Sequence, residues 1–361
     1  THPDHRTIAD FRKRFLDELA GLFTEVLLIA QAMGLLKLGT VSLDGTKPVL
    51  SEAEGIKANA SKHKALSFEH ASRLEEQLKG EVEALLRLAE QADNTPLPAA
   101  LDLPLELKRR EQRLAVIAAA KAEIEARAHA RFAAEQAEYE RKLAEREARR
   151  ERTGRKPAKA PEPGPRAKDQ VSLTDAESRI MPTAGGGFEQ AYNAQAGVDT
   201  ETHLIVAQHV TDHTNDKQEI GPALACLDAL PEALGAVDAL LADTGYHRQE
   251  NLERCAAAGI DPDIPEARQG HHPPLAERLA ADPPTPQGQP TPAEANAHRL
   301  RTRDGKARYA KRKATVETVF GIIKQVQGFR QFLLRGLRAV QGEWALVCMG
   351  WNLKRLFALK G

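Results

Sequence analysis

The chain has 361 residues, of which 42% are hydrophobic and 28% charged, and this ordinary globular composition excludes a wholly disordered or fibrous protein. It carries 51 basic and 51 acidic residues, so only a local cluster of basic side chains could attract nucleic acid. The three cysteines are far apart and in no C-x-x-C spacing, which argues against a disulfide framework or a structural zinc site. No apolar run is long enough to span a membrane and the first residues lack a signal peptide, which predicts an intracellular protein without a membrane partner.

Residues 1–39 are predicted to form an N-terminal helical segment of two helices, because apolar residues recur there at helical spacing. The chain does not begin with methionine, so we expect this segment to be truncated. Residues 40–66 are predicted to hold a strand and an insert. The strand is the alternating run T-V-S-L-D-G-T-K, which begins at Thr40 and ends in an Asp-Gly turn.

Residues 67–152 are rich in Ala, Glu, Lys, Arg and Leu, with one interruption near Asn94–Pro98, and this composition predicts two long helices that form a hairpin. A dimerising coiled coil is the alternative to a solvated antiparallel hairpin. Residues 153–170 are rich in proline and charge and are predicted to be a linker without a packed element.

Residues 171–361 have the mixed pattern of an α/β domain. An apolar strand is predicted to end at Asp243, and the proline-rich residues 267–297 are predicted to be a surface or disordered loop. The other predicted elements are a strand hairpin at 191–199 and 203–211, a short strand at 259–265, and helices at 216–230, 248–258, 306–327 and 338–359.

Three acidic residues occupy positions at which α/β folds collect catalytic groups. Asp44 lies on the first strand, Asp243 at the end of a later strand and Glu317 within a predicted helix. Three convergent carboxylates would suit two Mg²⁺ ions that act in phosphoryl transfer. Spacing alone does not select this trio among 51 acids.

Four motifs occur in the order found in bacterial insertion-sequence transposases of the DDE type, which the chain resembles over nearly its whole length. They are V-S-L-D-G-T-K (41–47), Y-N-A-Q-A-G-V-D (192–199), A-D-T-G-Y (242–246) and V-E-T-V-F-G-I-I-K (316–324). The resemblance implies an α/β, ribonuclease-H-like mixed sheet with a long helical insertion after the first strand and N-terminal helices. It also implies that Asp44, Asp243 and Glu317 are the catalytic and metal-binding triad.

The same resemblance implies an activity and its partners. The activity is metal-dependent cleavage at insertion-sequence ends, followed by strand transfer into target DNA. The implied cofactor is Mg²⁺, for which Mn²⁺ can substitute. The implied partners are transposon-end and target DNA and further copies of the chain, which would form a homo-oligomer on the DNA in the bacterial cytoplasm, at the nucleoid.

A basic stretch precedes the predicted catalytic glutamate. Residues 299–313 contain eight basic residues and one acid, which predicts contacts with DNA phosphates. Lys324 lies seven residues after Glu317 and so shares its helix face, where the family has a DNA-binding basic residue. Tyr309 and Arg312 resemble the family's upstream tyrosine and arginine, although the spacing Y-x-x-R-x-x-x-E is missed by one residue. The DNA-binding candidates are Lys324, Lys313, Arg312, Lys311, Arg308 and Tyr309.

Several alternatives stay open. Residues 48–55 separate D-G-T-K from I-K-A-N-A-S, and this insert could leave a decayed transposase that acts only as a DNA-binding or helical interaction protein; a stand-alone nuclease is a third possibility. Asp175 or Asp199 could replace Asp44 as the first ligand. Asp216 resembles another recurrent family acid, but we expect it to be a helix N-cap. We expect ordinary surface or edge histidines, and no zinc site, at His203, His209 and His213.

Overall fold

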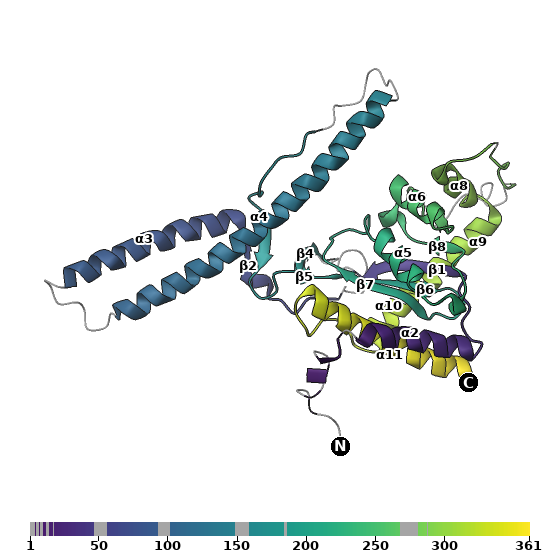
Figure 1. Ribbon diagram of the computed structural model, residues 1–361, viewed down its shortest axis with the longest axis horizontal. Coiled ribbons are helices and arrows are strands. Elements are labelled where there is room, and N and C mark those ends of the chain that lie inside the picture. Colours follow the sequence, from purple (N-terminus) through teal and green to yellow (C-terminus); the bar gives the residue numbers. More distant parts are fainter. Residues whose placement is uncertain are drawn as a thin grey trace. The chain divides into compact units, whose positions relative to one another are not determined.

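The computed structural model describes a few residues before Glu18 and then residues 18–46, 56–92, 102–148, 159–183, 186–267, 281–286 and 288–361. The predicted insert at 48–55 and most of the first predicted helix lie outside these ranges. The chain forms two compact units, one made of Thr1–Ala60 with Ser178–Gly361 and the other of Ser61–Glu177. Their elements are labelled in Figure 1.

The first unit is built on a five-stranded mixed sheet with the order β7-β6-β1-β8-β9. The central strand β1 is antiparallel to β6 and parallel to β8, and β8 is parallel to β9. This arrangement confirms the predicted ribonuclease-H-like α/β fold. The strand bounds are β1 Thr40–Thr46, β6 Asn193–Asp199, β7 Ile205–Thr211, β8 Ala239–Leu241 and β9 Asp261–Asp263, with a separate hairpin of β4 Arg179–Pro182 and β5 Phe188–Ala191.

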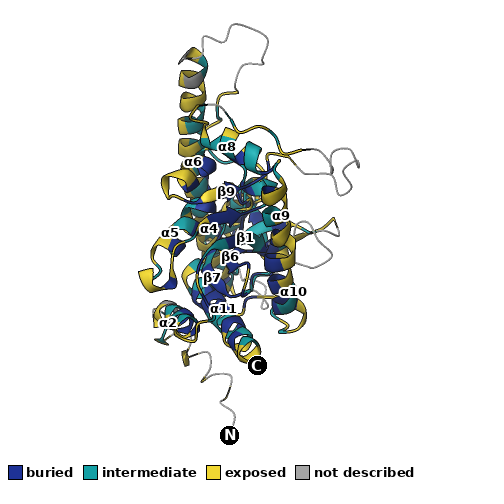
Figure 2. Cartoon of the chain, turned by 90° about the vertical axis from the view of Figure 1, so that its right-hand side faces the viewer, coloured by how far each residue is buried: buried dark blue, intermediate teal, exposed yellow. Residues whose placement is uncertain are grey.

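Helices cover the sheet, so its strands are largely buried (Figure 2). Below the sheet in Figure 1 lie α2 (Glu18–Ala32) and α11 (Leu337–Lys360), and above it lie α5 (Ile220–Asp228) and α6 (Gln249–Ala257). Trp344 fixes α11 to the sheet, because its indole Nε1 donates to the Gln195 carbonyl at 2.9 Å. Every residue of β6 is buried, including the polar side chains of Asn193, Gln195 and Asp199, which alternate with small apolar residues along the strand.

The segment after β9 contains helices that the sequence pattern did not fully define. Helix α8 (Pro292–Arg299) begins inside the predicted loop 267–297, so that prediction is wrong at its C-terminal end. A capping box starts this helix: Thr291 Oγ1 accepts from the Glu294 amide, and the Glu294 carboxylate accepts from the Thr291 amide at 2.8 Å. The single helix predicted at 306–327 consists of α9 (Arg303–Arg312), a π-helix (Lys313–Glu317) and α10 (Thr318–Gln325).

The second unit is a helical hairpin with a short strand pair at its base. Strand β2 (Ala65–Ser67) is antiparallel to β3 (Gln170–Ser172), and α3 (Phe68–Ala92) packs against α4 (Leu103–Ala148). Lys121 on α4 pairs with Glu75 on α3 at 2.7 Å. From Lys159 onwards the predicted linker is described, and it is anchored to α4, because Arg131 donates to the Gly164 carbonyl at 3.0 Å and to Asp169 at 2.8 Å.

The remaining short elements are the 3₁₀ turns η1 Lys62–Lys64, η2 Glu232–Leu234 and η3 Thr244–Tyr246. The core of the first unit surrounds large buried side chains, among them Trp344, Tyr192, Tyr246 and Phe332. None of the described helices is both long and apolar enough to cross a bilayer.

Candidate active site

Asp44 and Asp243 lie at equivalent positions on two neighbouring parallel strands. Ser42 of β1 is opposite Leu241 of β8, and each aspartate follows two residues later along its chain. The chain turns directly after β8, where the Asp243 carboxylate accepts the Gly245 amide at 2.8 Å as the N-cap of η3. The parallel pairing therefore brings together two acids that are about 200 residues apart in the sequence.

The electrostatics of Asp44 confirm that these acids are close. Burial and, next, the negative charge of Asp243 raise the pKa of Asp44 from 3.8 to about 7. Arg312 opposes this rise and Asp216 adds to it. The end of β1 thus carries more negative charge than its basic neighbour offsets.

Arg312 connects the first and third acids of the predicted triad. Its guanidinium donates to Asp44 Oδ2 at 3.0 Å and to Glu317 Oε1 at 2.9 Å. The Arg312 side chain is only 10% exposed, whereas that of Glu317 is 49% exposed. A positive charge therefore lies between Asp44 and Glu317 in this structure.

The π-helix Lys313–Glu317 explains the irregular spacing of Tyr309, Arg312 and Glu317. A π-turn closes over five residues, so it holds one residue more than an α-turn. Arg312 and Glu317 are five apart and still point to the same face, as their hydrogen bond shows. The extra residue that breaks Y-x-x-R-x-x-x-E is thus absorbed by the helix. Tyr309 is near Arg312, which opposes the rise that burial causes in the pKa of the tyrosine.

Lys324 extends the site from the next helix. Its side chain is largely buried in α10, and burial lowers the pKa of the ammonium group while Asp44 opposes that change. Lys324 is thus within electrostatic reach of the central carboxylate.

The other basic candidates have partners in the protein. Arg308 donates to both oxygens of the buried Asp263, at 2.6 and 3.1 Å, and Lys311 donates to Glu201 at 2.6 Å. Lys313 is exposed on the π-helix. The cluster that the composition singles out is therefore partly neutralised within the fold.

The structure adds Asp216 to the site. Asn193 Nδ2 and Gln195 Nε2 each donate to Asp216 Oδ1 at 2.9 Å, and the aspartate is buried. The N-cap position of α5 is occupied by Glu219, so the predicted capping role of Asp216 is wrong. Its partners come from β6, which is remote in sequence, and helix-start patterns carry no signal for such contacts.

Gly45 of the D-G-T motif is required by this same network. A Cβ at this position would overlap the side chains of Gln195 and Asn193, which lie on the neighbouring strand. Gln195 also accepts a hydrogen bond from the buried Tyr246 hydroxyl. A layer of buried polar side chains thus lies directly beside Asp44.

Of the two alternative first ligands, Asp199 lies on the same sheet but away from Asp44. Asp199 is opposite Val41, near the other end of β1 from Asp44, and its carboxylate accepts from the amide and hydroxyl of Thr202 at 2.8 and 2.7 Å. Asp175 belongs to the unit Ser61–Glu177 and not to the sheet. Asp199 therefore stabilises the β6–β7 turn.

Two of the three histidines share one buried acid. His209 Nε2 lies 2.8 Å from Glu219 Oε2, and His213 Nδ1 lies 2.7 Å from Glu219 Oε1. The hydrogen bond with Glu219 raises the pKa of His213. His203 is in the β6–β7 turn with φ of 62°.

Within the described ranges, no group of three or more histidine, cysteine or acidic side chains is arranged to hold an ion. The donor chemistry at β1 and β8 nevertheless fits a hard dication, because Asp44 and Asp243 supply carboxylate oxygens and an excess of negative charge. Glu317 can join them once Arg312 gives up its hydrogen bond. The donor atoms therefore suit the ion chemically, while the third acid, Glu317, is hydrogen-bonded to Arg312.

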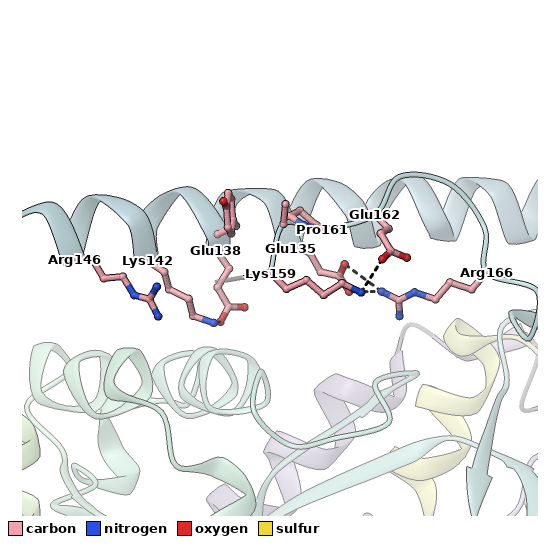
Figure 3. Close-up of a pocket in the computed structure, with 10 residues that line it drawn as sticks. Glu135, Glu138, Lys142, Arg146, Lys159, Pro161, Glu162 and Arg166 are labelled. Atoms are coloured by element: carbon pink, nitrogen blue, oxygen red, sulfur yellow. Dashed lines mark hydrogen bonds and ion pairs between the residues drawn. The ribbon is translucent and has the colours of Figure 1, made fainter. Parts of the chain in front are cut away.

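A pocket in the helical unit offers no competing site (Figure 3). It lies between α4 and residues 159–166, and its charged side chains pair with one another: Lys159 with Glu162 at 2.7 Å and Arg166 with Glu135 at 3.2 Å. These pairs are well exposed to solvent, so they bind each other weakly and leave no concentrated charge for a ligand.

The first unit is thus a ribonuclease-H-like sheet with acidic residues near the ends of two parallel strands and a third on a later helix. In comparisons with known proteins, the transposase DDE domain family matches residues 155–353, and the chain belongs to this family. The protein is accordingly a transposase, and its family implies DNA as partner and generally a divalent metal ion as cofactor. No curated protein and no solved structure matches the chain.

Proposed function

We propose that this transposase cleaves phosphodiester bonds at the ends of an insertion sequence and transfers the freed strand into target DNA. The observation that carries the proposal is the adjacency of Asp44 and Asp243, where burial and, next, the negative charge of Asp243 raise the pKa of Asp44 to about 7. A purely structural acid would be neutralised by its neighbours. Two adjacent acids that are only partly neutralised suit the binding of a dication.

Asp44, Asp243 and Glu317 would hold Mg²⁺, or Mn²⁺ in its place, which when bound supplies Lewis acidity and activation of water. Arg312 occupies one oxygen of Asp44 and one of Glu317, and its release would make both oxygens of each carboxylate available to the ion. Its planar guanidinium then suits a bidentate contact with a DNA phosphate. Lys324 supplies a second positive charge on the α10 side of Asp44.

Two in-line displacements make up the proposed reaction. The oxygen of water attacks phosphorus, the bond to the 3′ oxygen breaks, and the leaving oxygen takes up a proton as a 3′-hydroxyl. That hydroxyl then attacks a target phosphodiester, a new bond to phosphorus forms, and the target's own 3′ oxygen leaves. Both steps exchange one phosphorus–oxygen bond for another, so no covalent bond to the protein is required.

The proposal also extends to assembly and domain organisation. Two element ends must be held together for transfer, so we infer a homo-oligomer on DNA at the nucleoid of a bacterial cell. We assign residues 40–66 and 171–361 to the catalytic domain, residues 1–39 to a helical segment before it and residues 67–152 to a hairpin inserted within it, joined by the stretch 153–170. The compact helical unit Ser61–Glu177 also includes the flanking residues 61–66 and 171–177, so it extends beyond the hairpin at both ends.

The test is cleavage of a labelled duplex that carries the terminal repeats of the flanking element, with Mg²⁺ or Mn²⁺. Wild type and the matched control Asp228→Asn, an exposed residue on α5, should cut at the repeat boundary. Asp243→Asn should not cut. If wild type binds the duplex in a salt-dependent way but does not cut it, the protein is only a DNA-binding protein; cutting without joining would make it a nuclease.

A further inference from the structure

The chain between Glu317 and Glu343 contains four basic residues and no acidic one. Lys324 is one of them and belongs to the site described above. The other three, Arg330, Arg335 and Arg338, lie in or beside the connection between α10 and α11, and all three are exposed. We call residues 328–338 the arginine loop.

The backbone of the arginine loop is held in place from two directions. The Phe332 amide donates to the Lys57 carbonyl at 2.8 Å, and the Lys57 amide donates to the Arg330 carbonyl at 3.0 Å. Phe332 itself is fully buried. These contacts attach the loop to the segment that returns after β1, although the two are about 270 residues apart.

A buried carboxylate fixes the middle of the loop. Glu343 on α11 accepts from the Leu333 amide at 3.0 and 3.1 Å and from the Leu334 amide at 3.0 Å. A side chain that holds two successive amides prevents the loop from changing its path. The arginines are therefore presented by a rigid backbone and lose little conformational freedom there on binding.

The contacts of Arg330 and Arg335 orient their charges without neutralising them. Arg335 Nε donates to the Asn59 carbonyl at 2.9 Å, and Arg330 Nε donates to the Lys324 carbonyl at 3.2 Å. In the part of the chain that the structure describes, neither Arg330 nor Arg335 forms an ion pair. Arg308 and Lys311 of the stretch 299–313, in contrast, are paired with acids.

The arginine loop adjoins the end of α10, the helix that carries Lys324. Arg330 donates to the Lys324 carbonyl, and Asp44 opposes the fall that burial causes in the pKa of Lys324. The loop therefore follows directly after the helix that brings a basic residue to the candidate active site. Arg335 keeps four of its five N–H donors and Arg330 keeps three, and such guanidinium groups match the geometry of phosphate oxygens.

We propose that the arginine loop binds the backbone phosphates of the DNA duplex that flanks the bond cleaved at Asp44 and Asp243. The proposal rests on the proposed function for the identity of the partner. Contacts of this kind position DNA and carry no base sequence, so the loop binds duplexes of any sequence equally.

The test measures the affinity of the full chain for a labelled duplex of random sequence, without divalent metal, over a range of salt concentrations. The variant Arg330→Gln/Arg335→Gln removes two charges and keeps side chains of similar length. We expect at least a tenfold loss of affinity, on the order of what two phosphate contacts supply, and a salt slope reduced by about 2.

Two comparison variants separate charge from structure. Arg109→Gln/Arg254→Gln removes two exposed arginines that are ion-paired with Glu106 and Glu250, and it should bind as wild type does. Arg330→Lys/Arg335→Lys keeps both charges and should retain most of the salt slope. An unchanged slope in the glutamine variant, or an equal loss in the Arg109 and Arg254 variant, overturns the proposal.

The outcome is independent of catalysis, because binding is measured without metal. If the glutamine variant loses affinity while wild type never cuts element ends, the arginine loop stands and the proposed function fails. If wild type cuts but the slope is unchanged, the proposed function stands and the arginine loop is excluded. If the glutamine variant changed the oligomeric state of the DNA-free protein, the loop would be assigned to contacts between copies of the chain, and the proposal would be overturned.

Discussion

Two acids on the strands that flank β8, β1 and β9, have opposite surroundings. Asp263 is opposite Leu241 in the β8–β9 pair, is completely buried, and receives two hydrogen bonds from Arg308 with Arg299 3.5 Å away. Asp44 on β1 shares a single arginine with Glu317 and has two further acids near it. The same residue type is therefore neutralised in one place and left with excess negative charge in the other.

This difference separates acids that stabilise the fold from acids that are available to ligands. The charge of a buried carboxylate surrounded by arginines is already neutralised, and removal of the carboxylate leaves the arginines unpaired. A carboxylate beside other carboxylates costs stability until a cation binds, as is usual for functional sites. Position at a strand end is common to both and does not distinguish them.

The largest expected effect is on catalysis. Asp44→Asn should lower single-turnover cleavage of element ends by at least about a thousandfold, because the acids act as one unit. Asp263→Asn, assayed at a temperature at which it is folded, should remain within about tenfold of wild type, since its carboxylate binds Arg308. Equal losses in the two variants would show that the comparison does not separate function from structure.

The next effect is on stability, where the two substitutions should have opposite signs. Asp263→Asn should lower the free energy of unfolding by about 3 kcal/mol, because it leaves Arg308 without its charged partner. Asp44→Asn should raise it by about 1 kcal/mol at pH 8, because it removes a buried charge and its repulsion from Asp243. Urea unfolding of both variants measures these changes, and a destabilised Asp44→Asn would contradict the assignment of surplus charge.

A smaller effect concerns the one basic neighbour of Asp44. Arg312→Gln should raise the pKa of Asp44 above about 7, by about one further unit, because loss of the positive charge disfavours the carboxylate. NMR titration of the carboxyl groups in the metal-free protein measures the pKa of Asp44 in the variant and in wild type. Lys313→Gln, on the exposed side of the same π-helix, is the control and should leave the titration unchanged.

The smallest effect comes from Glu219, a buried acid whose partners are histidines. The pKa of His213 is raised, so its contribution to stability is complete below about pH 6.5 and is lost as the pH rises through the folded-state value. Because His213 is partly exposed, we expect a loss of less than about 1 kcal/mol. His213→Gln should flatten the curve of unfolding free energy against pH above 6.5, and His63→Gln, an exposed histidine, should not.

Much of the fold was predictable because it depends on local patterns. Alternation identifies β1, β6 and β7, and apolar runs that end in acids identify β8. The capping box that starts α8 was overlooked because the prolines around it dominate the composition. The capping box is a local signal, so α8 can be predicted from the sequence without any contact between distant residues.

The parts that could not be predicted depend on contacts between distant residues. Asp216 joins the site through Asn193 and Gln195, and Arg308 is paired with Asp263, 45 residues earlier. The π-helix is a different case. It accommodates one extra residue between Arg312 and Glu317, so the two side chains still meet although their spacing departs from the motif. A strict motif would therefore have rejected an arginine that the fold brings to the carboxylates.

The order of the strands also has a consequence for folding. Strands β1 and β6 are antiparallel neighbours, yet the pairing of Asp44 with Ala196 closes a loop of about 150 residues. Closing such a loop costs about 2 kcal/mol more than closing a ten-residue turn. The pairing of β2 with β3 shortens the loop between β1 and β6. Once Ala65 is paired with Ser172, the residues of the hairpin between them no longer add to the length of chain that has to be closed. We expect the helical hairpin to form early and the central strand of the catalytic sheet to pair late, so the position of Asp44 is set among the last steps of folding.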